Sequence, residues 1–494
     1  MNRGEVFTPP ETVKFMVEKL GEVDGKRILE PGAGEGAFLK ELLRRGVQPE
    51  HVTAFDTNPD FGKIYQALGI NYRISDFLLH QNPIEFPELF DCVIGNPPYL
   101  SRHSTYIQTH KKSLLKRFKE TGVYDTYSLF IYHGLRFLKE GGILCFIVSD
   151  TFLTIEYHQK LRHLLLENYE LREIISAPKN LFAKQGVNNT PCIIVVEKKR
   201  PDSHHQVAFV DRLKNEQEYR SPTRTRRLRQ QHFLKIRGYP ISINADSFVA
   251  ELFSSLPSIN EVMEGHIGLH THNNRKFIAA IQGTKLAEKF TKEERTVITR
   301  NLLSQNGKWR PYLKKGGKEQ YYREIEEAID WSPEAVTQYD IPKKGDLFLR
   351  EGIIISGVSR KLAARYMPKG CLWDSNKAIG FVSRNSEVSI WYLSGLLNSK
   401  LYNFLAKGVL NTTNCLQIDD IRRLPFKYPS QEAKSSIETG VKQIVKNLKK
   451  NPGYDYSKEQ AQIDELIFEL YEAPKGLRDF IEAKYQANKM VKKS

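Results

Sequence analysis

Four consecutive residues, Asn96-Pro97-Pro98-Tyr99, combine an amide, a rigid turn and an aromatic ring. They follow residues 90–95, an apolar run that is typical of a buried strand. Each proline fixes its own φ and keeps the preceding residue out of the α region, so the turn holds its groups in a fixed relation. The Asn96 side-chain oxygen and the Pro97 carbonyl form an acceptor pair for an amino group, and Tyr99 can stack on the heterocycle that carries it. The alternative is that Asn96 only caps the turn after a strand.

Three acidic residues occupy comparable positions earlier in the chain. Glu30, Asp56 and Asp76 each end a short strand-like run, and helix-length stretches separate these runs. Such alternation predicts a doubly wound parallel sheet. Ligands of these sheets bind outside the carboxyl ends of the strands. We therefore expect the three acids and Asn96 to lie along one edge of the sheet.

The glycine-rich turn over residues 32–36 favours a ligand that approaches the backbone closely. Gly32 and Gly34 permit that approach, and the turn leads into a helix N-terminus. Glycine loops also serve dinucleotides, but this one contains no Arg or Lys for a pyrophosphate. Its acids instead favour a cationic cofactor without phosphates, and S-adenosylmethionine fits that description. Asp56, 26 residues after Glu30, is spaced to accept hydrogen bonds from a ribose diol.

Two other residues, Thr8 and Asp76, keep two interpretations each. The Thr8 hydroxyl either binds the methionine end of the cofactor or belongs to a turn before the amphipathic helix expected over residues 12–20. Asp76 either binds the cofactor or caps a helix. Phe77 follows it and can pack against an adenine ring.

Composition and charge place the chain among globular proteins with a polyanionic partner. Its 494 residues suffice for about two or three domains. Residues 1–200 hold 26 basic and 24 acidic side chains, while the other 294 hold 48 and 34, so the net charges are +2 and +14. The asymmetry predicts a near-neutral catalytic half and a basic half that faces a polyanion. Solubilising surface charge is the alternative interpretation.

Membrane, secreted and metal-dependent classes are not expected. No run approaches the roughly 18 apolar residues of a membrane span. The first five residues show no signal-peptide pattern. Five scattered cysteines predict neither a disulfide framework nor a zinc site and suit a reducing cytoplasm.

The order of these motifs resembles the gamma group of adenine-N(6) DNA methyltransferases, specifically the TaqI methyltransferase family. The likeness rests on residues 4–9, 29–34 and 96–99 with the acids between them, and it continues through residues 124–130, 143–148 and 151–153. It implies a Rossmann-like α/β methyltransferase domain that uses S-adenosylmethionine, then a mixed α/β target-recognition domain with a helical C-terminal extension. The corresponding ranges are a catalytic domain over 1–200, a basic linker over 201–245, a recognition domain over 246–430 and the extension over 431–494.

The resemblance also implies roles for individual residues. Asn96, Pro97, Tyr99 and Phe182 would form the catalytic pocket, with Phe182 facing Tyr99 across a flipped adenine. The residues after Phe182 depart from the TaqI pattern, and a core phenylalanine is the alternative. Phe77 and Phe130 would sandwich the cofactor adenine. The full set of implied cofactor-binding residues is Thr8, Glu30, Gly32, Gly34, Asp56, Asp76, Phe77, Asn96, Pro98 and Phe130.

The basic half supplies candidate DNA contacts. Arg and Asn have the geometry to read guanine and adenine edges, but sequence does not separate base contacts from phosphate contacts. The expected partner is double-stranded DNA, with a cognate restriction endonuclease acting independently, and the chain is expected to be monomeric, in the bacterial cytoplasm at the nucleoid. The candidate contacts are Arg224, Arg226, Arg227, Arg275, Arg300, Arg360 and Asn414.

Other functions remain open at this point. The Asn-Pro-Pro-Tyr motif also serves methyl transfer to cytosine N(4), to RNA bases and to glutamine side chains. A methylase half of a restriction–modification fusion and a non-catalytic DNA-binding subunit are further alternatives. The basic second half favours DNA, and the motif order favours adenine.

Overall fold

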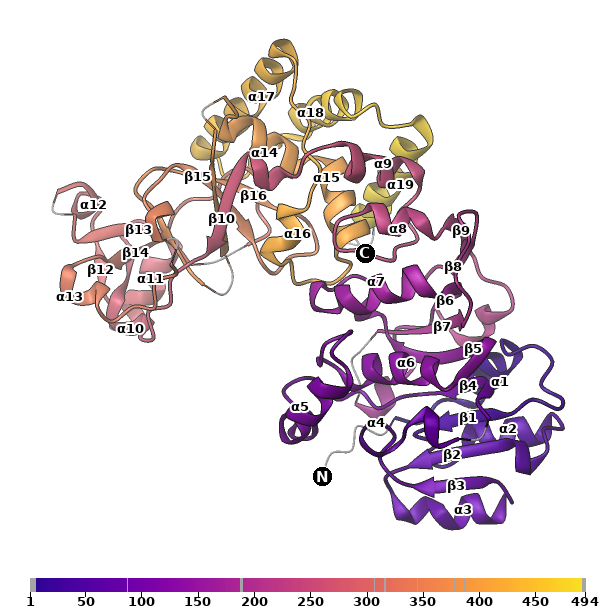
Figure 1. Ribbon diagram of the computed structural model, residues 1–494. Helices are drawn as coiled ribbons and strands as arrows, with labels where there is room; N and C mark the ends of the chain where they lie inside the picture. The colour runs from indigo at the N-terminus through magenta and orange to yellow at the C-terminus, as the bar shows by residue number, and fades with distance from the viewer. Residues whose placement is uncertain are drawn as a thin grey trace. The chain divides into compact units, whose positions relative to one another are not determined.

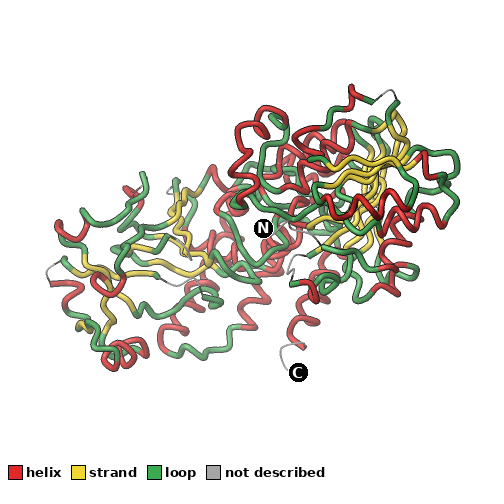
Figure 2. The backbone as a smooth tube through the Cα atoms, turned by 90° about the horizontal axis from the view of Figure 1, so that it is seen from below, coloured by secondary structure: helices red, strands yellow, loops and turns green. Residues whose placement is uncertain are grey.

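The computed structural model describes residues 6–86, 88–186, 190–305, 307–314, 317–343, 345–375, 378–385 and 387–490. The chain folds into two compact units, Met1–Ala250 and Glu251–Ser494. Strands gather inside each unit and helices surround them (Figure 2). Gly4 and Glu5 of the predicted N-terminal motif lie outside the described residues.

The first unit is built on one nine-stranded sheet, with the strand order β3-β2-β1-β4-β5-β7-β6-β8-β9 (Figure 1). The five strands from β3 to β5 run parallel to one another. β7 is antiparallel to both of its neighbours, a reversal that the sequence did not predict. The strands are β1 (Ile28–Pro31), β2 (Val52–Asp56), β3 (Asn71–Ile74), β4 (Phe90–Gly95), β5 (Leu138–Ser149), β6 (Glu170–Ser176), β7 (Pro191–Glu197), β8 (Gln206–Val210) and β9 (Thr225–Arg229).

Helices bury both faces of this sheet, which confirms the doubly wound α/β class. Ile28 and Cys92 share one apolar cluster with Val13 of α1 and Leu39 of α2. On the opposite face, the ring of Phe55 contacts that of Phe77 in α4. Burial on both faces explains the continuous apolar run that forms β4. The helices are α1 (Pro10–Glu18), α2 (Ala37–Arg44), α3 (Gly62–Ala67), α4 (Phe77–His80), α5 (Thr105–Arg117), α6 (Thr126–Arg136), α7 (Gln159–Asn168) and α8 (Gln231–Lys235).

The linker expected over residues 201–245 is not what the structure shows. β8 pairs in parallel with β6, and β9 pairs antiparallel with β8, so this segment completes the sheet. Val207, Phe209 and Leu228 are buried while their neighbours are more exposed, which is the alternation of a strand with one covered face. In β9 the arginines on both sides of Leu228 hid this pattern in the sequence.

The second unit contains two sheets together with helices, so it is a mixed α/β unit. A four-stranded antiparallel sheet has the order β10-β18-β15-β16, and a five-stranded mixed sheet has the order β12-β11-β14-β13-β17. Trp373 is fully buried, and a Cβ at Gly380 would lie only 2.2 Å from its ring, so close packing there requires glycine. The strands are β10 (Met263–Ile267), β11 (Ile278–Ile281), β12 (Val297–Ile298), β13 (Trp309–Leu313), β14 (Glu327–Asp330), β15 (Gly352–Ser356), β16 (Ala364–Met367), β17 (Leu372–Trp373) and β18 (Ala378–Ser383).

The C-terminal part of the second unit is helical, as its periodicity predicted. The predicted apolar stripe of α17, from Ile437 to Leu448, is buried. Among the described residues, no helix combines the length and apolar character needed to cross a bilayer. The helices from the end of the first unit onward are α9 (Ser247–Ser255), α10 (Asn274–Phe277), α11 (Lys285–Lys292), α12 (Leu302–Gln305), α13 (Pro333–Val336), α14 (Ile390–Asn398), α15 (Lys400–Phe404), a π-helical turn (Leu405–Leu410), α16 (Ile418–Arg422), α17 (Gln431–Lys450), α18 (Ser457–Leu470) and α19 (Lys475–Met490).

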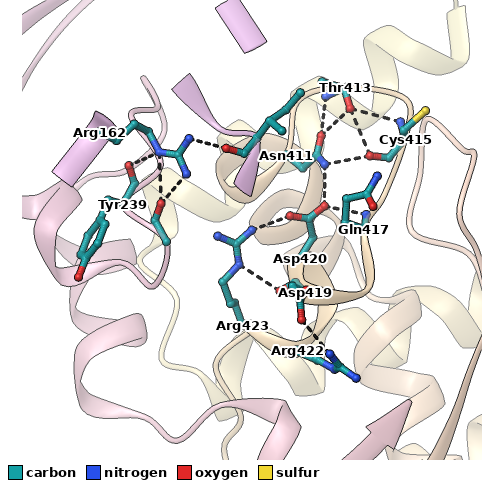
Figure 3. Close-up of polar contacts among 12 residues, drawn as sticks. Arg162, Tyr239, Asn411, Thr413, Cys415, Gln417, Asp419, Asp420, Arg422 and Arg423 are labelled. Atoms are coloured by element: carbon teal, nitrogen blue, oxygen red, sulfur yellow. Dashed lines mark hydrogen bonds and ion pairs between the residues drawn. The ribbon is translucent and has the colours of Figure 1, made fainter. Parts of the chain in front are cut away.

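A fully buried arginine ties α7 to the segment after α8. The Arg162 guanidinium donates to the backbone carbonyls of Gly238 and Tyr239 (Figure 3). It also donates to the carbonyls of Phe152 and Ile155. Four backbone carbonyls therefore accept from one side chain, and of these the Ile155 carbonyl also accepts from the His158 amide.

We expect Arg162→Met to lower the free energy of unfolding by at least about 3 kcal/mol, because the substitution leaves several buried carbonyls without a donor. Urea denaturation followed by circular dichroism measures the change. Arg172→Met is the matched control: its ion pair with Glu197 is half exposed, so a loss under about 1 kcal/mol is expected. Equal losses in the two variants would contradict this role for Arg162.

Candidate active site

One cavity of about 970 Å³ opens among the carboxyl ends of the parallel strands of the first unit. Residues from β1 and β2 and from the turn that follows β4 line it together with the N-terminal segment and α6. It gathers every residue for which the sequence predicts cofactor contact. These are Thr8, Glu30, Gly32, Gly34, Asp56, Asp76, Phe77, Asn96, Pro98 and Phe130.

The glycine-rich turn is held by its neighbour strand so that its backbone faces the cavity. The amides of Gly32 and Ala33 donate to the Phe55 carbonyl at 2.7 and 3.0 Å, and the Gly34 amide donates to Asp56 Oδ2 at 2.8 Å. Gly32 and Gly34 have φ of 76° and 52°. L side chains rarely adopt such values, so glycine is needed at both positions.

Glu30 places a buried carboxylate in the wall of the cavity. Its side chain is 2% exposed, and among the described residues Oε2 has no hydrogen-bond partner. Burial, reinforced by repulsion from Asp56, raises the pKa of Glu30 well above its usual value. A buried carboxylate with an unpaired oxygen is costly unless a donor or a positive charge meets it. The wall therefore favours a cationic ligand.

Hydrogen bonds to the N-terminal segment fix the orientation of the Asn96 amide. Its Nδ2 donates to the Val6 carbonyl at 2.8 Å and to Thr8 Oγ1 at 3.1 Å. Since a carbonyl only accepts, the NH2 group must face this segment, and the opposite Oδ1 is buried without a partner in the described part of the chain. Gln185 holds the same segment through two reciprocal bonds of 2.7 Å to the Phe7 backbone. Asn96 thus presents a fixed, unused acceptor.

The two aromatic pairs predicted to enclose ring systems are in direct contact instead. Tyr99 and Phe182 have centroids 6.2 Å apart at 60°, and Phe182 is 1% exposed within an apolar cluster. Phe77 and Phe130 have centroids 5.4 Å apart at 39°. Phe182 therefore adjoins Tyr99 as expected, but a base would have to separate these rings. Phe77 and Phe130 form one wall of the cavity rather than two facing walls.

Asp76 caps a helix, which confirms one of the two interpretations that the sequence left open, and it also lies in the cavity wall. Its Oδ1 accepts from the amides of Leu78 and Leu79, which caps α4, while the residue also lines the cavity. Its Oδ2 accepts from the Tyr106 hydroxyl at 2.9 Å.

Helix α5 supplies cavity residues that sequence reasoning missed. Tyr106 and His110 come from this helix and reach the cavity wall, as does His103 just before it. Their position directly after the Asn-Pro-Pro-Tyr turn was the one signal that could have identified them. Thr126, at the start of α6, secures that turn by donating to the Pro98 carbonyl and accepting from the Leu100 amide at 3.0 Å.

Four of the seven candidate DNA contacts have side chains that bond to other described residues. Arg224, Arg226 and Arg300 form ion pairs with Asp211, Asp246 and Glu324, respectively. Arg275 donates to the Glu293 carbonyl at 3.2 Å. The remaining three candidates are exposed, and their side chains have no hydrogen bond or ion pair to any residue that the structure describes. They are Arg227, Arg360 and Asn414.

One three-residue group with metal-ligand chemistry occurs within the described ranges, in the second unit. His270, His272 and Asp340 offer ligand atoms that all lie within 4.8 Å of one another. All three are exposed, and a His272–Asp340 ion pair of 2.8 Å accounts for their approach.

Comparison with known proteins finds a family match in a segment of each unit. Residues 47–182 match the Eco57I restriction-modification methylase family, and residues 308–426 match the TaqI-like C-terminal specificity domain. The type II methyltransferase M.BstVI of Geobacillus stearothermophilus is 29% identical over 244 residues, which is 40% of this chain and 43% of that protein. The adenine-specific methyltransferase BrxX of Escherichia coli O9:H4 is 23% identical over 366 residues, 71% of this chain and 29% of its own length.

The fold of the whole chain also has a solved counterpart. The type IIL restriction-modification enzyme MmeI, solved in complex with DNA, superposes over 97% of this chain and 75% of its own with a TM-score of 0.60 at 12% identity. The chain spans less than half of the length of the two relatives named above. The two family matches confirm the resemblance noted in the sequence over residues 47–182 and 308–426.

We expect the stability of the ligand-free protein to fall as the pH rises through the folded pKa of Glu30. Because burial raises that pKa in the folded state, the unfolded state loses the Glu30 proton first, above about pH 4.5. Between this pH and the folded pKa the folded state still holds the proton, so the free energy of unfolding falls as the pH rises. The slope is at most about 1.4 kcal/mol per pH unit. Glu30→Gln should make the fall in stability with rising pH less steep in urea denaturation series between pH 5 and 8; Asp150 and Asp464, whose pKa values burial raises to about 6, contribute to the slope that remains.

Glu41→Gln on α2 is the control, since ion pairs with Arg44 and Arg45 lower its pKa to about 2. Its stabilising contribution is lost only as the pH falls from about 4.5 toward 2, so this variant should leave the slope between pH 5 and 8 intact. An unchanged slope in Glu30→Gln would contradict the assignment to Glu30.

Proposed function

We propose that this chain, in which residues 47–182 belong to the Eco57I restriction-modification methylases and residues 308–426 form a TaqI-like specificity domain, is a site-specific DNA methyltransferase. It would transfer a methyl group from S-adenosylmethionine to the exocyclic amine of an adenine in duplex DNA. The observation that carries the proposal is the unused, fixed acceptor of Asn96 in the same cavity as the unpaired carboxylate of Glu30.

The cavity residues fit S-adenosylmethionine by charge and by hydrogen bonding. When bound, this cofactor supplies a methyl group activated by a positively charged sulfur. Glu30 would meet the positive charge of the cofactor, and Thr8 its methionine end. Asp56 would accept from the ribose hydroxyls and Asp76 from the adenine amine. Phe77 and Phe130 would give the adenine an apolar wall, and Gly32, Gly34 and Pro98 would let it approach the backbone.

Asn96 and Pro97 would make the target amine reactive. The lone pair of an adenine amine is delocalised into the ring, so the nitrogen is a poor nucleophile. Asn96 Oδ1 and the Pro97 carbonyl would accept its two hydrogens and favour a pyramidal nitrogen. These bonds strengthen as positive charge develops on the nitrogen, so they stabilise the transition state more than the ground state. The proton can leave after transfer, which removes the need for a strong base.

The target base would have to leave the helix to reach this cavity. Flipping costs a few kcal/mol, and stacking on an aromatic ring returns about 1–3 kcal/mol. Tyr99 is the ring that stands beside Asn96 in the turn. Separation of Tyr99 from Phe182 would open a slot with an aromatic wall on each side.

Adenine is favoured as the target by the motif order and by the name of the adenine-specific relative BrxX. Cytosine N(4), RNA bases and glutamine amides present similar planar amines and are distinguishable outcomes of the experiment below. An independent cognate endonuclease, a monomeric state and a place at the bacterial nucleoid accompany the proposal as expectations.

We expect Asn96→Ala to reduce methyl transfer by about 10²- to 10³-fold, the loss typical of removing one transition-state hydrogen bond. The assay incubates the chain with duplex DNA and methyl-labelled cofactor and maps the modified base by mass spectrometry. Cofactor affinity should change far less than the rate. Asn168→Ala, exposed on α7, serves as the control and should transfer at the original rate.

Three outcomes would overturn parts of this proposal. Label in protein alone would remove the DNA substrate, and label on cytosine would replace adenine. A substantial rate in Asn96→Ala would remove Asn96 from the mechanism.

A further inference from the structure

We propose that two loops of the second unit, residues 357–361 and 411–417, form one rigid surface that reads the DNA sequence, with Arg360 and Asn414 contacting base edges. We call these residues the paired-loop surface. The inference rests on the proposed function and deepens it, because it names the side chains that would decide which adenine is methylated.

The two loops are joined by an antiparallel bridge although 49 residues, 362–410, separate them in sequence. Val358 and Cys415 form an isolated antiparallel bridge. The Ser359 amide donates to the Asn414 carbonyl at 2.9 Å, and the Leu416 amide donates to the Gly357 carbonyl at 2.9 Å. One loop follows β15 directly, and the other follows the π-helical turn. The bridge therefore brings the backbones of Arg360 and Asn414 onto neighbouring loops.

The buried side-chain amide of Asn411 hydrogen-bonds to the backbone of the second loop, residues 411–417 (Figure 3). Asn411 is 2% exposed, and its Oδ1 accepts from the amide and the hydroxyl of Thr413 at 2.9 and 2.7 Å. Its Nδ2 donates to the Cys415 carbonyl at 2.9 Å and to Asp420 Oδ2 at 2.6 Å. Asn411 thus uses two donors and two acceptor positions, which fixes the backbone on both sides of Asn414.

Asp420, which accepts from Asn411, is itself held in a buried ion pair with Arg423. Asp420 is 1% exposed, accepts from the Gln417 amide at 2.8 Å and pairs with Arg423 at 2.6 Å (Figure 3). Loops that are ordered before binding lose less entropy on binding, and a fixed first shell discriminates better between similar ligands. This surface has the construction expected of a reader of sequence.

The groups that the paired-loop surface presents match the chemistry of base edges. Arg360 and Asn414 are exposed and have no side-chain partner within the described residues, whereas Arg224, Arg226 and Arg300 are held in ion pairs. Arg pairs with guanine O6 and N7, and Asn pairs with adenine N6 and N7. Val358 is 55% exposed and is suited to contact with a thymine methyl group.

A natural probe reports on this surface. Cys415 is exposed, whereas the other four cysteines, all in described positions, are buried. The recognition sequence is first mapped by methylation-sensitive sequencing of DNA from cells that express the full chain. The intact protein is then alkylated with N-ethylmaleimide, alone or saturated with a duplex that carries the mapped site. We expect the duplex to slow alkylation of Cys415 at least about 10-fold, read by mass spectrometry of the tryptic peptide, because bases would cover the thiol.

A duplex of equal length without the site is the control and should protect much less. Saturation is verified independently by a mobility shift. Full alkylation of Cys415 in a saturated complex would overturn the paired-loop surface while leaving the methyltransferase intact. Failure to methylate any DNA would instead remove the proposed function. Protection by an added protein but not by DNA would reassign the surface to a protein partner.

Substitutions distinguish base contacts, which set the methylated sequence, from phosphate contacts, which attract any DNA. Asn414→Ala and Arg360→Ala should each relax the methylated sequence at one position by about 5- to 100-fold, the discrimination of one bidentate contact, measured by sequencing the products from a randomised library. Lys458→Ala, an exposed cation on α18, should leave the sequence preference unchanged. Uniform weakening on every sequence would mark Arg360 and Asn414 as phosphate contacts and overturn the proposal.

Discussion

The buried carboxylate of Glu30 is the constraint around which the first unit is arranged. It stands at the end of β1, 2% exposed, with one oxygen unpaired among the described residues and with Asp56 nearby. Burial of an unpaired charge normally destabilises a fold, so such a group persists where a ligand completes it. The central parallel strands bring the other polar ends to the same edge. The glycine turn then leaves room for a ligand against the backbone.

Two sites in the molecule use one principle: the hydrogen bonds of one amide side chain fix the position of a polar group that stays available. The Asn96 NH2 group donates to Val6 and Thr8, which leaves Oδ1 as a fixed acceptor. The Asn411 amide hydrogen-bonds to Thr413, Cys415 and Asp420. These bonds fix the backbone around Asn414, whose side chain is exposed. Rigidity matters in both places because a catalytic acceptor and a base contact each lose effect when the geometry loosens.

Much of the first unit was predictable because its signals are local. Apolar runs, glycine turns and the polar residue after each strand indicated the doubly wound sheet and the cavity-lining residues, from Thr8 to Phe130. Less was predictable where charge masked periodicity, as in β9, where the buried Leu228 lies among arginines. The aromatic pairs were expected to stand apart, yet each pair is in contact, since ring separation depends on packing that no spacing reveals. Tyr106 was missed because its partner Asp76 lies on another element.

The sequence by itself determined the class of fold, the family resemblance and the identity of the polar groups at the carboxyl edge. These follow from short-range patterns, because strand ends, turns and motif order are written in consecutive residues. Only the tertiary structure decided which acceptors remain unused, which arginines are consumed by ion pairs, and that Arg360 and Asn414 lie on neighbouring loops. Hydrogen-bond partners and burial arise from contacts between distant segments. A group's availability for chemistry is therefore a property of the folded chain rather than of the residue type.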